Sequence, residues 1–334
     1  MAAHDSHVSW TASDARIYNL SVGAGGHAAD DGLLDHGSQP RPAPMAPLAT
    51  LPLGMLHRNA PPLLAPWRNG ADRALGELVN FDKKNLVHGD QSIVWPANAS
   101  VPVAASCVVK HRIIGLEQKR SGVVATSASD FVVDGRRICT SIASMFLRGG
   151  TLTERGKDMA SSLQWTPEES IRAALAKLKT AQRSGGTKDV FSSVLETAQN
   201  QAALYAVNGD DNPIHVDWEV AKQAGFPRPI LHGLCTFGMA FRALLPLAAK
   251  TLETTQELVN AVACTVRFSS PVFPGQKLML RATLVGDPGT AAASGVVSIT
   301  FDVVVHGGSS ATTVCRNGAA IFERKQASAP KAKL

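Results

Sequence analysis

The segment from Leu204 to His215 carries the side chains best suited to acid–base chemistry. It reads Leu-Tyr-Ala-Val-Asn-Gly-Asp-Asp-Asn-Pro-Ile-His. Asp210 and His215 stand five positions apart across a turn that Pro213 restricts, so both side chains can reach one water molecule without crowding each other. Asn212 lies between them, and its amide offers both a donor and an acceptor that can hold the water or orient the carboxylate.

A backbone amide further along the chain completes this set. Gly233 follows His232 and directly precedes a segment from Leu234 to Leu247, where apolar residues recur at helical spacing. This pattern predicts a buried helix whose positive end lies behind the Gly233 N–H, which suits a developing negative charge. Glycine also lets a ligand approach closely.

Plainer interpretations of these residues stay open. A string of turn formers such as Asn-Gly-Asp-Asp-Asn-Pro is more often a turn than an active site. His88 and His232 each precede a glycine after an aliphatic run, and either could be a structural histidine. Zinc is conceivable on Asp210, His215 and His232, but their spacing matches no known three-ligand pattern, so we predict no metal site.

The elements that must position these residues are mostly antiparallel strands. Apolar alternation broken by turns predicts strands at 101–116, 122–133 and 137–147, and again at 261–268, 277–286, 295–306 and 312–323. A turn is expected at Asp287-Pro288-Gly289. Between the two sets, Thr166-Pro167 starts a helix that continues over 171–182 and is expected to pack on the surface.

Two parts of the chain share a sequence pattern, which indicates an old duplication. Ile17-Tyr18 precedes His88-Gly89, and Leu204-Tyr205 precedes His232-Gly233. Only the second His-Gly pair is followed by a long apolar helix, since strands begin soon after the first.

The Asp210–His215 string resembles the signature of the hydratase 2, or MaoC-like, (R)-specific enoyl-CoA hydratase family, which includes the hydratase part of peroxisomal multifunctional enzyme type 2. The resemblance extends to the segments 86–91 and 267–275. It leaves out the extreme tails and matches poorly from about 25 to 70.

This resemblance implies an α+β double hot-dog fold, in which two antiparallel sheets each curl toward a helix and the N-terminal central helix is missing or reduced. The implied domains are an N-terminal substrate-binding half at 8–150, a linker with a surface helix at 151–190, a catalytic half at 191–325 and a flexible tail at 326–334. A long, half-open tunnel would favour medium or long acyl chains.

The resemblance also implies a hydro-lyase that adds water to trans-2-enoyl-CoA, giving (3R)-3-hydroxyacyl-CoA in fatty acid β-oxidation. Carried over by position, the catalytic residues are Asp210, His215, Asn212 and Gly233. The implied substrate contacts are His88, Gly89, Lys119, Asp211, Pro213, Ile214 and Phe268. Lys119 is a possible phosphate partner, although a lysine in a hairpin turn is more often only solvated. Asp211 should raise the pKa of one of the two adjacent carboxyls if both are buried.

No cofactor is expected, because the coenzyme A thioester is itself the substrate. The alternatives are a hot-dog acyl-CoA thioesterase, which would cleave the thioester, and a non-catalytic acyl-CoA binding protein. Intact Asp210 and His215 argue against the second, since binding alone needs neither group. Family resemblance makes a homodimer plausible.

Composition narrows the range of partners. The net charge of +6 comes with dispersed basic residues and only 5% aromatic residues, which fits attraction of a polyanionic small molecule better than nucleic acid. Neither a membrane span nor a secretory signal is expected, and the five scattered cysteines suit buried, reduced thiols. The ending Ala332-Lys333-Leu334 is a variant of the Ser-Lys-Leu address, so we expect a peroxisomal import receptor as a partner.

Overall fold

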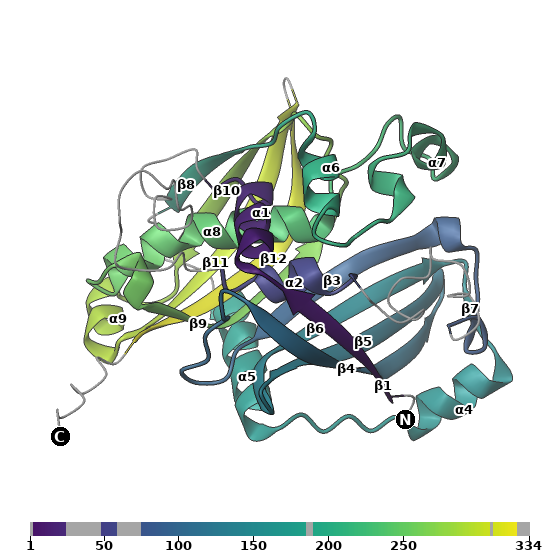
Figure 1. Ribbon diagram of the computed structural model, residues 1–334, viewed down its shortest axis with the longest axis horizontal. Coiled ribbons are helices and arrows are strands. Elements are labelled where there is room, and N and C mark those ends of the chain that lie inside the picture. Colours follow the sequence, from purple (N-terminus) through teal and green to yellow (C-terminus); the bar gives the residue numbers. More distant parts are fainter. Residues whose placement is uncertain (1–2, 25–47, 59–74, 185–189, 308–309, 326–334) are drawn as a thin grey trace.

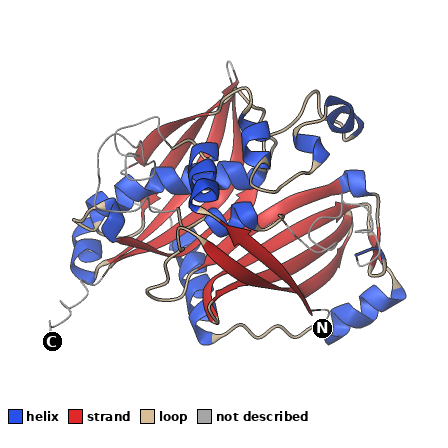
Figure 2. Cartoon of the chain, viewed as in Figure 1, coloured by secondary structure: helices blue, strands red, loops and turns tan. Residues whose placement is uncertain are grey.

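The computed structural model describes residues 3–24, 48–58, 75–184, 190–307 and 310–325. Within these ranges, the main feature is one ten-stranded antiparallel sheet (Figures 1 and 2). Its strands lie in the order β1 (Ala3–Trp10), β4 (Ala105–Lys119), β5 (Gly122–Val133), β6 (Arg136–Arg148), β3 (Leu86–Val94), β9 (Val259–Phe268), β12 (Ser310–Arg324), β11 (Val296–Gly307), β10 (Lys277–Leu284) and β8 (Val190–Glu196). The predicted tail at 326–334 and the predicted peroxisomal signal at its end lie outside the described residues.

The first five strands of this order come from the N-terminal half of the chain and the other five from the C-terminal half. They meet where β3 pairs with β9, with Asp90 opposite Arg267. Arg267 donates to both carboxylate oxygens of Asp90, from Nε at 2.7 Å and from Nη2 at 3.0 Å. This two-point pairing holds the register of the seam between the halves.

The C-terminal strands curl around helix α8 (Gly233–Thr251), which extends the predicted helix by one turn at its C-terminal end. Thirteen of its residues are buried, and it contacts β8, β9, β10 and β11. Figure 1 shows α8 crossing one face of these strands. Within the described residues, the helices of the N-terminal half are shorter than α8: they include α1 (Ala12–Ser21), α2 (Leu51–Met55) and η2 (Lys83–Asn85). The architecture is the expected α+β double hot-dog.

The His-Gly pairs are not equivalent in the structure, contrary to the sequence interpretation. His88 and Gly89 lie within strand β3, whereas His232 caps α8 and Gly233 is its first residue. The Tyr18 and Tyr205 segments do correspond, because each forms a helix after the first strand of its half. Helix α1 packs on α6 (Gln201–Ala206), with the two tyrosine ring centroids 6.2 Å apart.

Helix α5 (Glu169–Ser184) is the predicted linker helix, but it is more than a surface attachment. It follows β7 (Thr151–Leu152) and α4 (Glu154–Ser162) in the chain. Strand β7 pairs with β2 (Val79–Asn80). Four residues of α5 form a buried stripe: Ile171, Ala174, Leu178 and Ala181. This stripe packs on strand residues of both halves, namely Val94, Ala263, Ala319 and Ile321.

A second difference concerns the expected turn at Asp287-Pro288-Gly289, which is the start of helix α9 (Pro288–Ser294). Asp287 caps it by accepting from the Thr290 amide at 2.8 Å, and Gly295 ends it at a φ of +70°. Pro288 at the first turn already has the backbone angle that a helix needs. The remaining short helices are η3 (Pro213–His215), α7 (Trp218–Gln223) and η4 (Gln256–Leu258).

The packing of α5 can be tested by truncating its stripe. Leu178→Ala should lower the free energy of unfolding by about 2–5 kcal/mol, because the side chain is only 2% exposed and its removal leaves a cavity. Lys177→Ala, at an exposed position beside it, is the matched control and should change little. Urea unfolding measures both variants, and equal stability of the two would mean that α5 is only loosely attached.

Candidate active site

The turn between α6 and α7 brings the carboxylate and the imidazole together. Asp210 Oδ1 accepts from the Asn212 amide at 3.4 Å, and Asn212 Oδ1 accepts from the Ile214 amide at 3.3 Å. Pro213 opens the 3₁₀ turn η3, which ends at His215. The string of turn formers therefore does form a turn, and this turn directs Asp210 and His215 to the same place.

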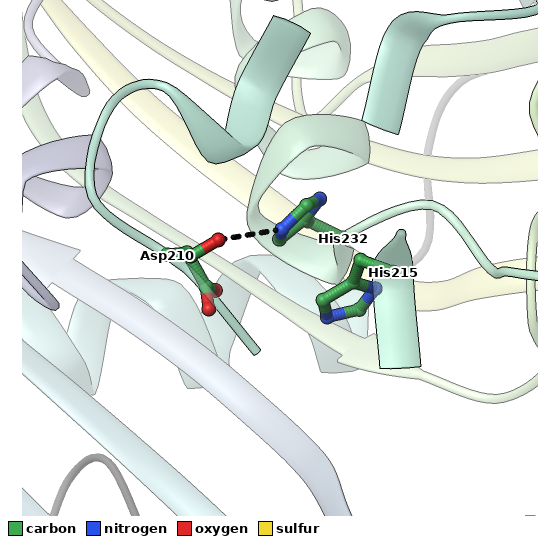
Figure 3. A group of neighbouring side chains, drawn as sticks. All are labelled: Asp210, His215 and His232. Carbon is green, nitrogen blue, oxygen red and sulfur yellow. Dashed lines mark hydrogen bonds between the residues drawn. The ribbon is translucent and has the colours of Figure 1, made fainter. Parts of the chain in front are cut away.

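Two stacked histidines stand beside Asp210 (Figure 3). The rings of His215 and His232 have centroids 3.7 Å apart at an interplanar angle of 27°. Nδ1 of His215 donates to the Ile230 carbonyl at 2.8 Å, and Nε2 of His232 donates to the Asp210 carbonyl at 3.2 Å. Because a carbonyl only accepts, these contacts leave Nε2 of neutral His215 as an acceptor.

Burial and neighbouring charges set the protonation states of these groups. Burial by itself raises the pKa of Asp210, but the positive charge of protonated His57, its contact with the carboxylate, and the positive charges that His232 and His215 gain on protonation outweigh burial and hold that pKa well below its usual value. Burial lowers the pKa of His215, and burial with the neighbouring His215 lowers the pKa of His232 to about 3. The site at neutral pH thus combines an ionised carboxylate with neutral imidazoles.

Asp211 does not share this environment. Asp210 is 6% exposed, whereas Asp211 lies on the surface. Asp211 was expected to raise the pKa of one of the two carboxyls only if both are buried. Because Asp211 is exposed, this condition is not met.

Gly233 lies where a side chain would crowd the ring of Phe268. A Cβ at this position would lie 3.2 Å from the ring of Phe268, closer than such atoms normally approach. As the first residue of α8, Gly233 has an amide without an acceptor inside the helix. The N–H is therefore available to a ligand oxygen, with the positive end of a 19-residue helix behind it.

A cavity of about 440 Å³ joins these groups at the junction of the two halves. Its lining includes all four predicted catalytic residues, Asp210, Asn212, His215 and Gly233, together with the predicted contacts His88, Gly89, Ile214 and Phe268. The His88 ring meets Phe268 edge-on with centroids 4.9 Å apart, and burial with the His57 charge lowers the pKa of His88 to about 4.

The other three predicted contacts are not part of this lining. Lys119 lies exposed at the end of β4 in an ion pair with Glu117, and Asp211 and Pro213 belong to the turn that carries Asp210. Two exposed basic residues, Lys84 and Arg148, do line the cavity, and thus mark where it meets solvent.

His57 is the residue that the sequence analysis missed. It follows α2 in the N-terminal half, lines the cavity, and places Nδ1 3.3 Å from Oδ2 of Asp210. The stretch around it is the one that matches the family poorly, so position could not identify it. The only signal was a histidine that directly follows the apolar run 51–56.

The same cluster has the residue types of a metal site. Ligand atoms of Asp210, His215 and His232 lie within 4.8 Å of one another. The two rings, however, are stacked nearly parallel, and their lone pairs lie in the ring planes, so they do not converge on one ion as tetrahedral coordination requires. The arrangement suits proton transfer better than metal binding.

Comparison with known proteins supports the resemblance seen in the motifs. Residues 180–307, which contain Asp210, His215 and Gly233, match the family described as MaoC like domain. The chain is 32% identical over 210 residues to an enoyl-CoA hydratase 2, peroxisomal, from Arabidopsis thaliana, covering 62% of each protein. It is 32% identical over 201 residues to a peroxisomal multifunctional enzyme type 2 from Drosophila melanogaster, covering 59% of this chain and 29% of that protein.

Solved structures agree on the fold. A MaoC-like dehydratase from Phytophthora capsici superposes with a TM-score of 0.68 at 20% identity, covering 97% of this chain and 96% of that one. A Mycobacterium tuberculosis protein described as a double hot-dog gives 0.57 at 14% identity, with coverage of 96% and 95%. The chain thus contains a region that matches the MaoC like domain, has the double hot-dog fold, and is similar in sequence to hydratases of the hydratase 2 type, of whose length it spans less than two thirds.

Proposed function

We propose that this protein is an (R)-specific enoyl-CoA hydratase, a hydro-lyase that reversibly adds water to trans-2-enoyl-CoA and gives (3R)-3-hydroxyacyl-CoA. One observation carries the proposal: an ionised carboxylate and a neutral imidazole lie on one cavity with the free amide of a helix N-terminus. Hydration of an enoyl thioester needs a base for water, an acid for the α carbon and a donor at the thioester oxygen.

The protonation states of Asp210 and His215 suggest which of them transfers the proton. The Asp210 carboxylate and Nε2 of His215 are both acceptors, so one water molecule can donate a hydrogen bond to each. As the water oxygen attacks the β carbon, His215 takes one of its protons. The same imidazole then returns a proton to the α carbon, so one H and one OH are added and the site ends in its starting state. Asp210 stays ionised and stabilises the transient imidazolium.

The remaining lining residues have roles that fit a coenzyme A thioester. The Gly233 amide would donate to the thioester oxygen as enolate charge develops, with the helix end adding to the stabilisation. Lys84 and Arg148, at the solvent end of the cavity, carry charge that suits the phosphates of coenzyme A.

The names of the relatives support both the reaction and its setting. Enoyl-CoA hydratase and 3-hydroxyacyl-thioester dehydratase describe the two directions of one reversible reaction. The assignments of (R)-specificity, of fatty acid β-oxidation and of a peroxisomal location rest on the hydratase 2 relatives, some of which carry the word peroxisomal. We propose a homodimer on the same ground.

Substitution of the catalytic pair tests this assignment. Asp210→Asn and His215→Ala should each lower kcat by about 10²- to 10⁴-fold, because the first removes the charge that orients the water and stabilises the imidazolium and the second removes the group that transfers the proton. Loss of the absorbance of the conjugated enoyl thioester measures the rate. Glu219→Gln, which neutralises an exposed carboxylate on nearby α7, serves as the control.

A parallel assay for free thiol separates hydration from the thioesterase alternative. Thiol release that keeps pace with loss of the enoyl absorbance would replace the hydratase by a thioesterase. A decrease of only a few-fold in both variants would remove Asp210 and His215 from the catalytic role.

We also propose that His57 is a positioning residue that keeps Asp210 ionised and oriented. The groups around Asp210 are His57 after α2, His88 on β3, His215 on η3 and His232 before α8. The charge of His57 lowers the pKa of both Asp210 and His215. It therefore favours the protonation state that the mechanism uses at each of them.

The pH dependence of activity tests the role of His57. Activity needs Asp210 ionised and His215 neutral, and both conditions fail as the pH falls, so removing His57 should raise both pKa values and move the acid limb of kcat/KM to higher pH. His57→Ala should shift that limb by about one pH unit. His7→Ala, at an exposed histidine on β1, is the control. An unchanged acid limb in a folded His57→Ala protein would leave His57 a purely structural role.

A further inference from the structure

A belt of polar side chains crosses the inner face of the N-terminal strands, where an acyl tunnel would be expected to be apolar. This polar belt is defined as Ser6 on β1, His111 on β4, Ser127 and Ser129 on β5, Ser141 on β6 and Gln91 on β3. Each of its members is 7% exposed or less. The same strands bury apolar residues beyond the belt, among them Val109, Phe131 and Cys139.

Hydrogen bonds hold the belt in place across the strands. His111 contacts the hydroxyls of Ser6 and Ser129, from Nε2 at 2.8 Å and from Nδ1 at 2.9 Å. Ser129 stands opposite Ser141 in the register of β5 and β6. The Gln91 amide donates to the Ser141 hydroxyl at 2.9 Å, so all five strands contribute to one polar feature.

Part of the hydrogen-bonding capacity of the belt is unused. Ser127, Ser129 and Ser141 line the same cavity as Asp210 and Gly233. No hydrogen bond joins the Ser127 hydroxyl to another residue that the structure describes. Nε2 of Gln91 donates to the Ser92 carbonyl at 2.8 Å, which fixes the amide orientation and leaves its buried Oε1 without a partner in the described chain.

The strand register places these hydroxyls at a distance from the reacting groups. His88 stands opposite Met145, and Met145 stands opposite Ala125. Ser127 is two residues along β5 from Ala125, and Ser141 is four residues along β6 from Met145. At about 3.3 Å per residue, the hydroxyls lie roughly 7 to 13 Å from the level of His88. The belt thus faces the middle or the far end of an acyl chain, and not its thioester.

A plain hydrocarbon chain is a poor partner for such a surface. It would displace water from the serine hydroxyls without replacing the lost hydrogen bonds, whereas an oxygen at that depth would restore them. The basic groups of the cavity, Lys84 and Arg148, lie at its exposed end, so a carboxylate at the belt would lack their charge.

We propose that the natural substrate carries a neutral hydrogen-bonding oxygen, a hydroxyl or a carbonyl, in the distal part of its acyl chain, and that the polar belt recognises it. The inference rests on the proposed hydratase function for its reaction and narrows its substrate class. Ser127 is the residue that most directly reports on it, because its hydroxyl supports no other described side chain.

Matched substrate pairs test the proposal. The ratio of kcat/KM for 10-hydroxy-trans-2-decenoyl-CoA to that for trans-2-decenoyl-CoA is measured in the wild type, Ser127→Ala and Ser141→Ala. The ratio should exceed one in the wild type and fall about five- to tenfold in each variant, the size of one neutral hydrogen bond. Ser192→Ala, at an exposed serine on β8, should leave the ratio unchanged.

Because each protein serves as its own reference, the ratio does not respond to a general loss of stability. Equal ratios in all the proteins, or a preference for the plain chain, would overturn the inference and leave the hydratase function standing. The same ratio is also measured for the ten-carbon substrate that carries a carboxylate at its distal end. A higher kcat/KM for this substrate than for the hydroxy substrate would overturn the choice of a neutral oxygen.

Calorimetric binding of the saturated pair, 10-hydroxydecanoyl-CoA and decanoyl-CoA, applies the same comparison without catalysis. If no enoyl thioester is hydrated but Ser127→Ala still abolishes the binding preference, the belt stands and the proposed reaction fails.

Discussion

A carboxylate that stays ionised while almost fully buried is the constraint on which the rest of this structure depends. Burial alone would protonate Asp210, so the protein must supply compensation at short range. His57 and the Asn212 amide supply it by contacting the carboxylate oxygens directly. The same burial keeps the imidazoles neutral, which lets one of them accept a proton.

The double hot-dog architecture explains how these groups come to share one cavity. The C-terminal half supplies the turn with Asp210 and His215 and the long helix whose first residue, Gly233, lines the cavity. The N-terminal half has no comparable helix among its described residues, and its strands contribute Ser127, Ser129 and Ser141 to the lining of the cavity. The seam between β3 and β9, held by Asp90 and Arg267, fixes one half against the other. The N-terminal half then contributes both a residue at the carboxylate and the polar belt.

Local patterns predicted much of this arrangement because the physical causes are local. Alternating strands, the apolar spacing of α8 and the turn chemistry of Asn212 and Pro213 all act within a few residues. Six of the seven expected strands lie within two residues of the observed bounds, the strand expected at 101–116 begins four residues later, and β1, β3 and β8 were not predicted. His57 could not be found in this way, since it approaches Asp210 only after 150 residues of intervening chain have folded. The repeated His-Gly motif led to a wrong prediction of equivalence. His88 and Gly89 lie within strand β3, whereas His232 and Gly233 form the start of helix α8. The polar belt could not be predicted because its serines, His111 and Gln91 are far apart in the sequence until the strand register aligns them.

The central claim is that Asp210 and His215 converge on one water molecule beside a thioester oxygen held by the Gly233 amide. An experimental structure of the protein with a saturated acyl-CoA, which binds but cannot be hydrated, tests it most directly. We expect a thioester oxygen about 3 Å from the Gly233 nitrogen and a water within hydrogen-bonding distance of both Asp210 and Nε2 of His215. A thioester bound away from Gly233, with no solvent molecule common to the two side chains, would contradict it.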